Sequence, residues 1–224
     1  MKNVGGVATS QAAATPWVSI TRDAARTACS NLGAGYSLIT NDQWQAIARN
    51  IEQVAANWSG GVVGSGSLNR GHSDNSPNSA LVADTDDANG CYGTDQSCPN
   101  GSWHEQKRTH LLSNGEVIWD FAGNVREWVK DDKTTLAIYT PELSIYYLDY
   151  PSITNVNNRK YFAPSNPAWG YTQGMGVIAG VSGDAILRGG YWGDLGGAGV
   201  FYAHLEFPPS SSSSAYGFRC TFVP

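Results

Sequence analysis

The clearest pattern of apolar and polar positions lies near the start of the chain and predicts two helices. In residues 21–33, TRDAARTACSNLG, apolar positions recur at helical spacing and Gly33 supplies a left-handed stop. The second helix begins at Thr40, because Gln43 follows three residues later and completes a capping box. Its apolar residues then form one stripe: Trp44, Ile47, Ala48, Ile51 and Val54.

The remaining chain shows little helical periodicity. Residues 60–103 and 131–184 are polar and rich in turns, and loops of such length are usually functional or specially braced. Between them, Asn114-Gly115 separates RTHLL from EVIWDF and predicts a β-hairpin. Three short strands follow, in AILRGGYWGD, GVFYAHLEF and YGFRCTFV. The serine run at 210–214 precedes a strand that must pack, so the chain predicts one domain over 1–224.

Composition narrows the classes of protein that fit. Hydrophobic residues make up 41% of the 224 residues, which is enough for a core, and charged residues only 15%. The net charge is −5 and no lysine or arginine cluster is present, so no nucleic-acid partner is expected. No apolar run approaches the roughly 20 residues of a membrane span, so no membrane insertion is expected. Residues 1–14 lack the apolar core of a signal peptide and are expected to be flexible.

Aromatic and cysteine residues add two expectations. Tryptophans are expected mainly in the core, whereas tyrosines are expected to be partly exposed, because the phenol tolerates water. The even number of cysteines permits a small disulfide between Cys91 and Cys98 and one between Cys29 and Cys220 that staples the ends of the domain. Buried free thiols fit the sequence equally well. The spacing is not that of a zinc site.

Several segments, taken in order, resemble the formylglycine-generating-enzyme type of the C-type lectin fold. They are ACSNLG with SLITNDQWQAIARNIE, RGHSDNSPNSALVADTDD, QKRTHLLSNGEVIWDFAGNVREWV, ILRGGYWGD and GFRC. The resemblance covers residues 15–224. It implies an α+β fold with a small twisted antiparallel sheet, two helices and many long loops. It also implies that the two ends of the domain lie together, which would place Cys29 near Cys220.

The same resemblance bears on catalysis. Enzymes of this type use two cysteines after the RGG motif to bind copper and oxidise a substrate cysteine, a chemistry that depends on soft thiolate ligands. The corresponding run here, RGGYWGDLGGAGVFYAHLEF, contains no cysteine. The sequence therefore predicts a protein that is not an enzyme, with no catalytic residues and no required cofactor.

Residues 188–220 resemble instead the variable region of proteins diversified by retroelements, in which adenine-directed mutagenesis rewrites asparagine codons. The resemblance implies a fixed framework at residues 188–190, 192, 198–201, 205, 209 and 217–220. The ligand-binding positions that it implies lie between them: Tyr191, Gly193, Asp194, Gly197, Tyr202, His204, Glu206, Phe207, Ser211, Ser213, Ala215 and Tyr216. Glu206 does not arise from an asparagine codon, so it needs another template codon or is fixed. Alternatively, Tyr202 and His204 are ordinary strand residues.

Tyrosine mixed with serine and glycine suits a binding surface, because the phenol gives rigid contact area and the small residues adapt around it.

GNVREW at 123–128 matches a calcium-binding segment of the family's enzymes, which implies Asn124 and Glu127 as ligands of a structural calcium ion. The alternative is a buried turn in which Asn124 satisfies backbone groups. The histidines show no metal spacing.

These observations predict a non-catalytic display protein that recognises a variable protein or glycan ligand on a cell surface. A formylglycine-generating-type oxidase and a structural module of a viral or surface assembly are the alternatives. The expected location is a virion or a cell surface. An oligomer would suit such a protein, because several weak sites act together.

Overall fold

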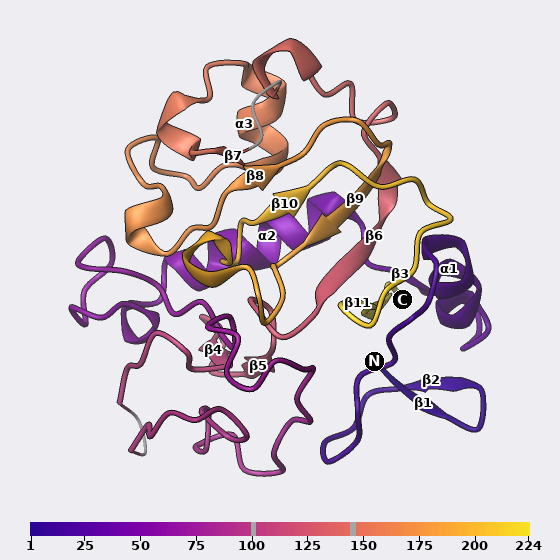
Figure 1. The fold of residues 1–224 in the computed structure, drawn as a ribbon, viewed down its shortest axis with the longest axis horizontal. Coiled ribbons are helices and arrows are strands. Elements are labelled where there is room, and N and C mark those ends of the chain that lie inside the picture. Colours follow the sequence, from indigo (N-terminus) through magenta and orange to yellow (C-terminus); the bar gives the residue numbers. More distant parts are fainter. Residues whose placement is uncertain (100–101, 144–146) are drawn as a thin grey trace.

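The computed structural model describes residues 1–99, 102–143 and 147–224, which fold around a mixed sheet (Figure 1). Its strands hydrogen-bond in the order β11-β6-β9-β10-β8-β7. Their bounds are β6 (Arg126–Asp132), β7 (Tyr147–Leu148), β8 (Ile178–Ala179), β9 (Ala185–Arg188), β10 (Ala203–His204) and β11 (Tyr216–Phe218). The pairs β11–β6 and β10–β8 are parallel, so the expectation of an antiparallel sheet is confirmed only for the pairs β6–β9, β9–β10 and β7–β8. Long connections, unlike tight hairpins, allow parallel neighbours.

Two helices begin where the sequence predicts them. Thr21 caps α1 (Arg22–Ser30), and the capping box of Thr40 and Gln43 opens α2 (Asn41–Glu52). Figure 1 shows α2 behind β9 and β10. A third helix, α3 (Val156–Phe162), lies in a stretch that shows no periodicity. It spans about two turns, which is too short for an apolar stripe to show in the sequence.

The sheet separates two apolar clusters. Ile186 of β9 packs in one cluster with Trp44 and Ile51 of α2, and its neighbour Leu187 packs in the other with Cys29 of α1 and Trp128 of β6. This division follows from the strand geometry, since successive side chains point to opposite faces. Both faces of the central strands are therefore covered.

Two small sheets lie near the ends of the chain. The first residues form a hairpin of β1 (Lys2–Val4) and β2 (Val7–Thr9), in which Ala8 is buried, rather than a free arm. Near the other end, β12 (Cys220–Phe222) pairs with β3 (Tyr36–Leu38). The hairpin predicted around Asn114-Gly115 is confirmed as β4 (Thr109–Leu111) and β5 (Val117–Trp119). Both possible disulfides are formed, Cys29–Cys220 and Cys91–Cys98.

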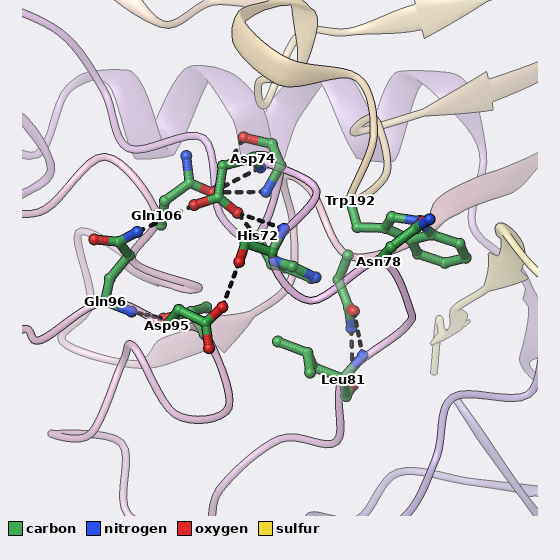
Figure 2. Close-up of polar contacts among 12 residues, drawn as sticks. His72, Asp74, Asn78, Leu81, Asp95, Gln96, Gln106 and Trp192 are labelled. Atoms are coloured by element: carbon green, nitrogen blue, oxygen red, sulfur yellow. Dashed lines mark hydrogen bonds and ion pairs between the residues drawn. The ribbon is translucent and has the colours of Figure 1, made fainter.

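The long polar loop is braced by side chains of the loop and of the segment that follows it. Described residues between 60 and 103 form no helix or strand. The Oε1 of Gln106 accepts hydrogen bonds from the N–H groups of Ser73 (2.7 Å) and Asp74 (3.2 Å), and Gln96 donates to Asp74 (3.2 Å) (Figure 2). Buried Arg108 donates to the carbonyls of Val82 and Tyr92 at 2.8 Å each. The bonds from Gln106 and Arg108 satisfy backbone groups that strand pairing would satisfy in a sheet.

No helix in the described ranges is long and apolar enough to cross a membrane.

The disulfides are expected to stabilise the fold unequally. Replacing Cys29 and Cys220 with alanine should lower the free energy of unfolding by about 5 kcal/mol, because the bond closes a sequence separation of 191. Removing Cys91–Cys98, with a separation of 7, should cost about 2.5 kcal/mol. Urea unfolding of the two double variants measures both values. An equal loss in the two variants would contradict this account.

Candidate ligand-binding site

A group of side chains meets around the start of β6, and most of them are ligand-binding positions that the sequence predicts. We call this group the aromatic cluster: Arg126, Tyr191, Asp194, Tyr202, His204, Phe207 and Tyr216. The backbone N–H of Arg126 donates to the carbonyl of Ala215 at 2.8 Å. Because β11 runs parallel to β6 with Tyr216 in register with Arg126, these side chains share one face.

The ion pair of Arg126 and Asp194 lies at the centre of the aromatic cluster. The Nε atom of Arg126 donates to Oδ2 of Asp194 at 3.0 Å and an Nη atom donates to Oδ1, so the two groups meet as a fork. Only 12% and 9% of the two side chains are exposed. The guanidinium carbon lies 4.5 Å from the ring centre of Tyr191 and 5.5 Å from that of Tyr202. The aromatic rings thus hold the cation as well.

Arg126 stays protonated although it is largely buried. Burial lowers the pKa of the guanidinium, but its hydrogen bonds with Asp194 and the nearby negative charge more than offset this effect and raise the pKa above its ordinary value. Arg126 is therefore a cation throughout the physiological range. Asp194 neutralises it.

A row of rings continues from Tyr202 across the aromatic cluster. The ring centres of Tyr202 and His204 are 6.2 Å apart, His204 stacks on Phe207 at 4.9 Å, and Phe207 meets Tyr216 at 5.3 Å. Burial, with a smaller effect of the Arg126 charge, lowers the pKa of His204 to about 3. The imidazole is therefore neutral at pH 7. Its Nδ1 atom is buried and has no hydrogen-bond partner among the described residues.

The turn that carries Tyr191 and Asp194 is fixed by backbone geometry. Gly189 and Gly190 both have φ of +85°, a conformation that glycine adopts without strain. A Cβ atom at Gly190 would also lie 2.8 Å from the Cβ of Ala198. The N–H of Tyr191 donates to Oδ2 of Asp194 at 3.0 Å, and the N–H of Asp194 returns a bond to the carbonyl of Tyr191 at 3.1 Å.

The braced polar loop supports the same turn. The indole N–H of Trp192 donates to Oδ1 of Asn78 at 2.7 Å, and the N–H of Asn75 donates to the carbonyl of Trp192 at 2.6 Å. Figure 2 shows Asn78 beside Trp192, while Gln96 and Gln106 lie at the other side of the loop. The loop of residues 60–103 therefore has a structural function beside the candidate site.

The aromatic cluster is more recessed than an exposed binding surface. Tyr202, His204 and Tyr216 have 1%, 4% and 7% of their area exposed. The expectation of partly exposed tyrosines is therefore wrong for Tyr202 and Tyr216. The inner strand β10 lies between β9 and β8, and Phe207 packs on Tyr216. Tyr191, Asp194 and Phe207 are half-buried and form the accessible rim.

The other predicted ligand-binding positions surround the cluster or lie apart from it. Glu206 is half-buried, with its Oε2 atom 3.7 Å from Nε2 of His204. Gly193 packs against the ring of Tyr191 and Gly197 against Val177, and Ala215 is buried. Ser211 and Ser213 lie in the turn before β11, and the carbonyl of Ser213 accepts from the N–H of Ser19 at 2.9 Å. These serines are not part of the aromatic cluster.

Sequence reasoning missed two neighbours of the predicted surface. Arg126 lies in GNVREW, which we interpreted as a possible metal segment, and no pattern in the sequence singled this arginine out. Tyr171, with 42% of its area exposed, lies against Gly196 and under the guanidinium of Arg70. It comes from a stretch without periodicity, so no pattern pointed to it.

The contacts of Asn124 and Glu127 do not fit a calcium ion. The Oδ1 atom of Asn124 accepts from the N–H of Leu81 (2.7 Å), and its amide donates to the carbonyl of Leu81 (3.1 Å) and to Asp120 (3.0 Å). Glu127 is paired through both oxygens with Arg219. A cation would have to displace this arginine and break the backbone pair. Asn124 thus satisfies backbone groups, the alternative that the sequence left open.

Two further places were considered as sites. Ligand atoms of Cys91, Cys98 and His104 lie within 4.8 Å of one another, but the disulfide leaves the two cysteines without thiolates. A cavity of about 640 Å³ lies between the N-terminal hairpin and β5, and its lining includes Trp119, Glu127 and Arg219. The paired charges of Glu127 and Arg219 neutralise each other there. Neither place brings together the predicted ligand-binding positions.

Comparison with known families identifies the domain. Residues 2–222 match the sulfatase-modifying factor enzyme 1-like domain, named FGE-sulfatase. The chain belongs to this family. The match confirms the resemblance at the level of the family, and the mixed helices and small sheets agree with the C-type-lectin-like fold of FGE-sulfatase domains. A comparison with curated proteins finds no match.

The neutral state of His204 predicts a pH effect. Its pKa is about 3 in the folded protein and close to 6.5 when unfolded, so the unfolded chain binds more protons between these values. The part of the stability that depends on His204 should therefore fall as the pH drops below about 6.5, by up to about 1.4 kcal/mol per pH unit. In urea unfolding, the free energy of unfolding of the wild type should fall relative to that of His204→Gln as the pH falls, because glutamine does not titrate. If the difference between the two free energies stays constant from about pH 7 to pH 4, His204 is not held neutral by burial.

Proposed function

We propose that this FGE-sulfatase domain is a non-catalytic ligand-binding module, and that the rim of the aromatic cluster contacts the ligand. The observation that carries the proposal is the convergence of Tyr191, Asp194, Tyr202, His204, Phe207 and Tyr216 on one place.

The distribution of burial supports diversification at the rim alone, because Tyr202, His204, Ala215 and Tyr216 are buried. Proposed framework residues form the interior: Arg188, Val200, Phe201 and Leu205 are fully buried. The guanidinium of Arg188 donates to Asn41 (2.9 Å) and Gln45 (3.1 Å), which fixes β9 to α2. The side chains of Tyr191 and Phe207 at the rim contact neighbouring rings and can change while the framework stays folded, whereas Asp194 is the partner of buried Arg126. A retroelement that rewrites these codons is the source of variation that we propose.

The chemistry of the rim suits a protein or glycan ligand. Tyr191 offers a flat ring face, Phe207 offers apolar area, and Glu206 offers a carboxylate acceptor. Rigid aromatic area beside adaptable small residues is the composition of antibody binding loops. We place the ligand on a cell surface and the protein on a virion or a cell surface, where an oligomer would add avidity.

A second candidate, a formylglycine-generating-type oxidase, is favoured by the family match alone. Such chemistry needs thiolates for copper. All four cysteines of this chain are joined in disulfides, so no free thiol is present. Oxygen consumption with a cysteine-containing peptide would establish this alternative.

Replacing Tyr191 with alanine tests the proposed surface. On an array of glycans and cell-surface proteins, the variant should lose at least about tenfold in affinity for any ligand that the wild type binds, as expected for an aromatic anchor. Tyr139→Ala is the matched control, because Tyr139 is half exposed (50%) and lies outside the cluster. Circular dichroism checks that both variants fold. Equal loss in both variants, or no loss at Tyr191, would reject the rim as the contact surface.

A further inference from the structure

We infer that Asp194 controls the charge of the ligand that this site accepts, and that its replacement by a small neutral residue opens a site for a carboxylate. The inference rests on the proposed function, since it treats the aromatic cluster as the ligand site. Arg126 is the anchor of the carboxylate site. Asp194 occupies the hydrogen-bond donors of Arg126 that the carboxylate of a ligand would otherwise bind.

The geometry of the fork defines the chemistry. Asp194 meets Nε and an Nη atom of Arg126 with both of its oxygens, which is the arrangement in which a guanidinium best binds a carboxylate. The carboxylate of a ligand would meet the same donors. Truncation of Asp194 to alanine removes the carboxylate, a group one carbon smaller than acetate, and leaves its space beside Arg126.

The guanidinium is held in place without Asp194. The ring of Tyr191 lies 4.5 Å from it and that of Tyr202 lies 5.5 Å from it, while the backbone of Arg126 is fixed in the sheet by Ala215 and by its register with Tyr216. The donors are therefore preorganised, which reduces the cost of binding.

The environment also supplies a driving force and an opening. A largely buried arginine without a partner is strongly unfavourable, so a carboxylate that replaces the lost partner is favoured. The Asp194 side chain retains 9% exposure, and the next residue, Leu195, is 58% exposed. A small anion can therefore reach the vacated position from solvent.

Position 194 is also one that the proposed diversification can change. Asparagine becomes aspartate through one adenine of its codon, so relatives diversified at this position would include neutral residues. In the present chain, Asp194 excludes acidic ligands from Arg126. In a neutral variant, Arg126 would accept them. One residue thus sets the charge preference of the rim.

Acetate rescue of Asp194→Ala tests the inference. In sodium chloride the variant should unfold at a lower temperature than the wild type, and replacing chloride by acetate at equal ionic strength should raise its unfolding temperature by about 2–4 °C more than that of the wild type. Glucuronate and N-acetylaspartate amide then distinguish the carboxylate of an acidic sugar from that of an acidic side chain. Specific stabilisation by either supports the inference, and the stronger effect identifies the source.

The double variant Arg126→Gln/Asp194→Ala is the control. Like the single variant, it loses the hydrogen bond from the N–H of Tyr191 to Asp194, but it also lacks the guanidinium. Acetate should therefore raise its unfolding temperature no more than that of the wild type. If Asp194→Ala folds only in acetate, the inference is supported. If acetate shifts the single and double variants equally, or if the single variant stays unfolded in acetate while the double variant folds, the inference is overturned. These outcomes use small probes, so they stand apart from the array result that tests the proposed function.

Discussion

Strand alternation at residues 201–205 is the constraint on which the rest of the site depends. Phe201, Ala203 and Leu205 are fully buried in the core beside α2, so Tyr202 and His204 must project to the opposite face of the sheet. That face also receives Arg126 from β6 and Tyr216 from β11, because β11 pairs with β6 in parallel register. A shift of one residue in β10 would exchange the two sets of side chains between the faces of the sheet.

The sequence allowed much of the fold to be predicted, and the reasons for the failures are physical. The capping box at Thr40 and the Asn114-Gly115 turn are local signals, and both appear where they were expected. α3 is too short to show a periodicity, and the parallel pairing of β11 depends on contacts far apart in the chain. The order of a hairpin can be inferred from neighbours in sequence, but the order of such a sheet cannot.

The candidate site was predicted in part. The alternation of framework and interleaved positions identified Tyr191 and Asp194, which meet around Arg126, and Phe207, which stacks on His204. It did not reveal Arg126, because this residue belongs to an earlier segment and joins the site only through the sheet. It also did not reveal how deeply Tyr202 and Tyr216 are buried, since burial depends on Phe207 and on the strands on either side.

Membership of the FGE-sulfatase family establishes the fold of the chain but not its function, which depends on the side chains at the site.

Sequencing the DNA that flanks the coding region tests most directly whether this site is diversified. Our account predicts a near-copy of the segment for residues 188–220 whose differences fall at template adenines, in the codons of the interleaved positions, with a reverse-transcriptase gene nearby. Absence of such a copy, or differences spread equally over the framework codons, would contradict it.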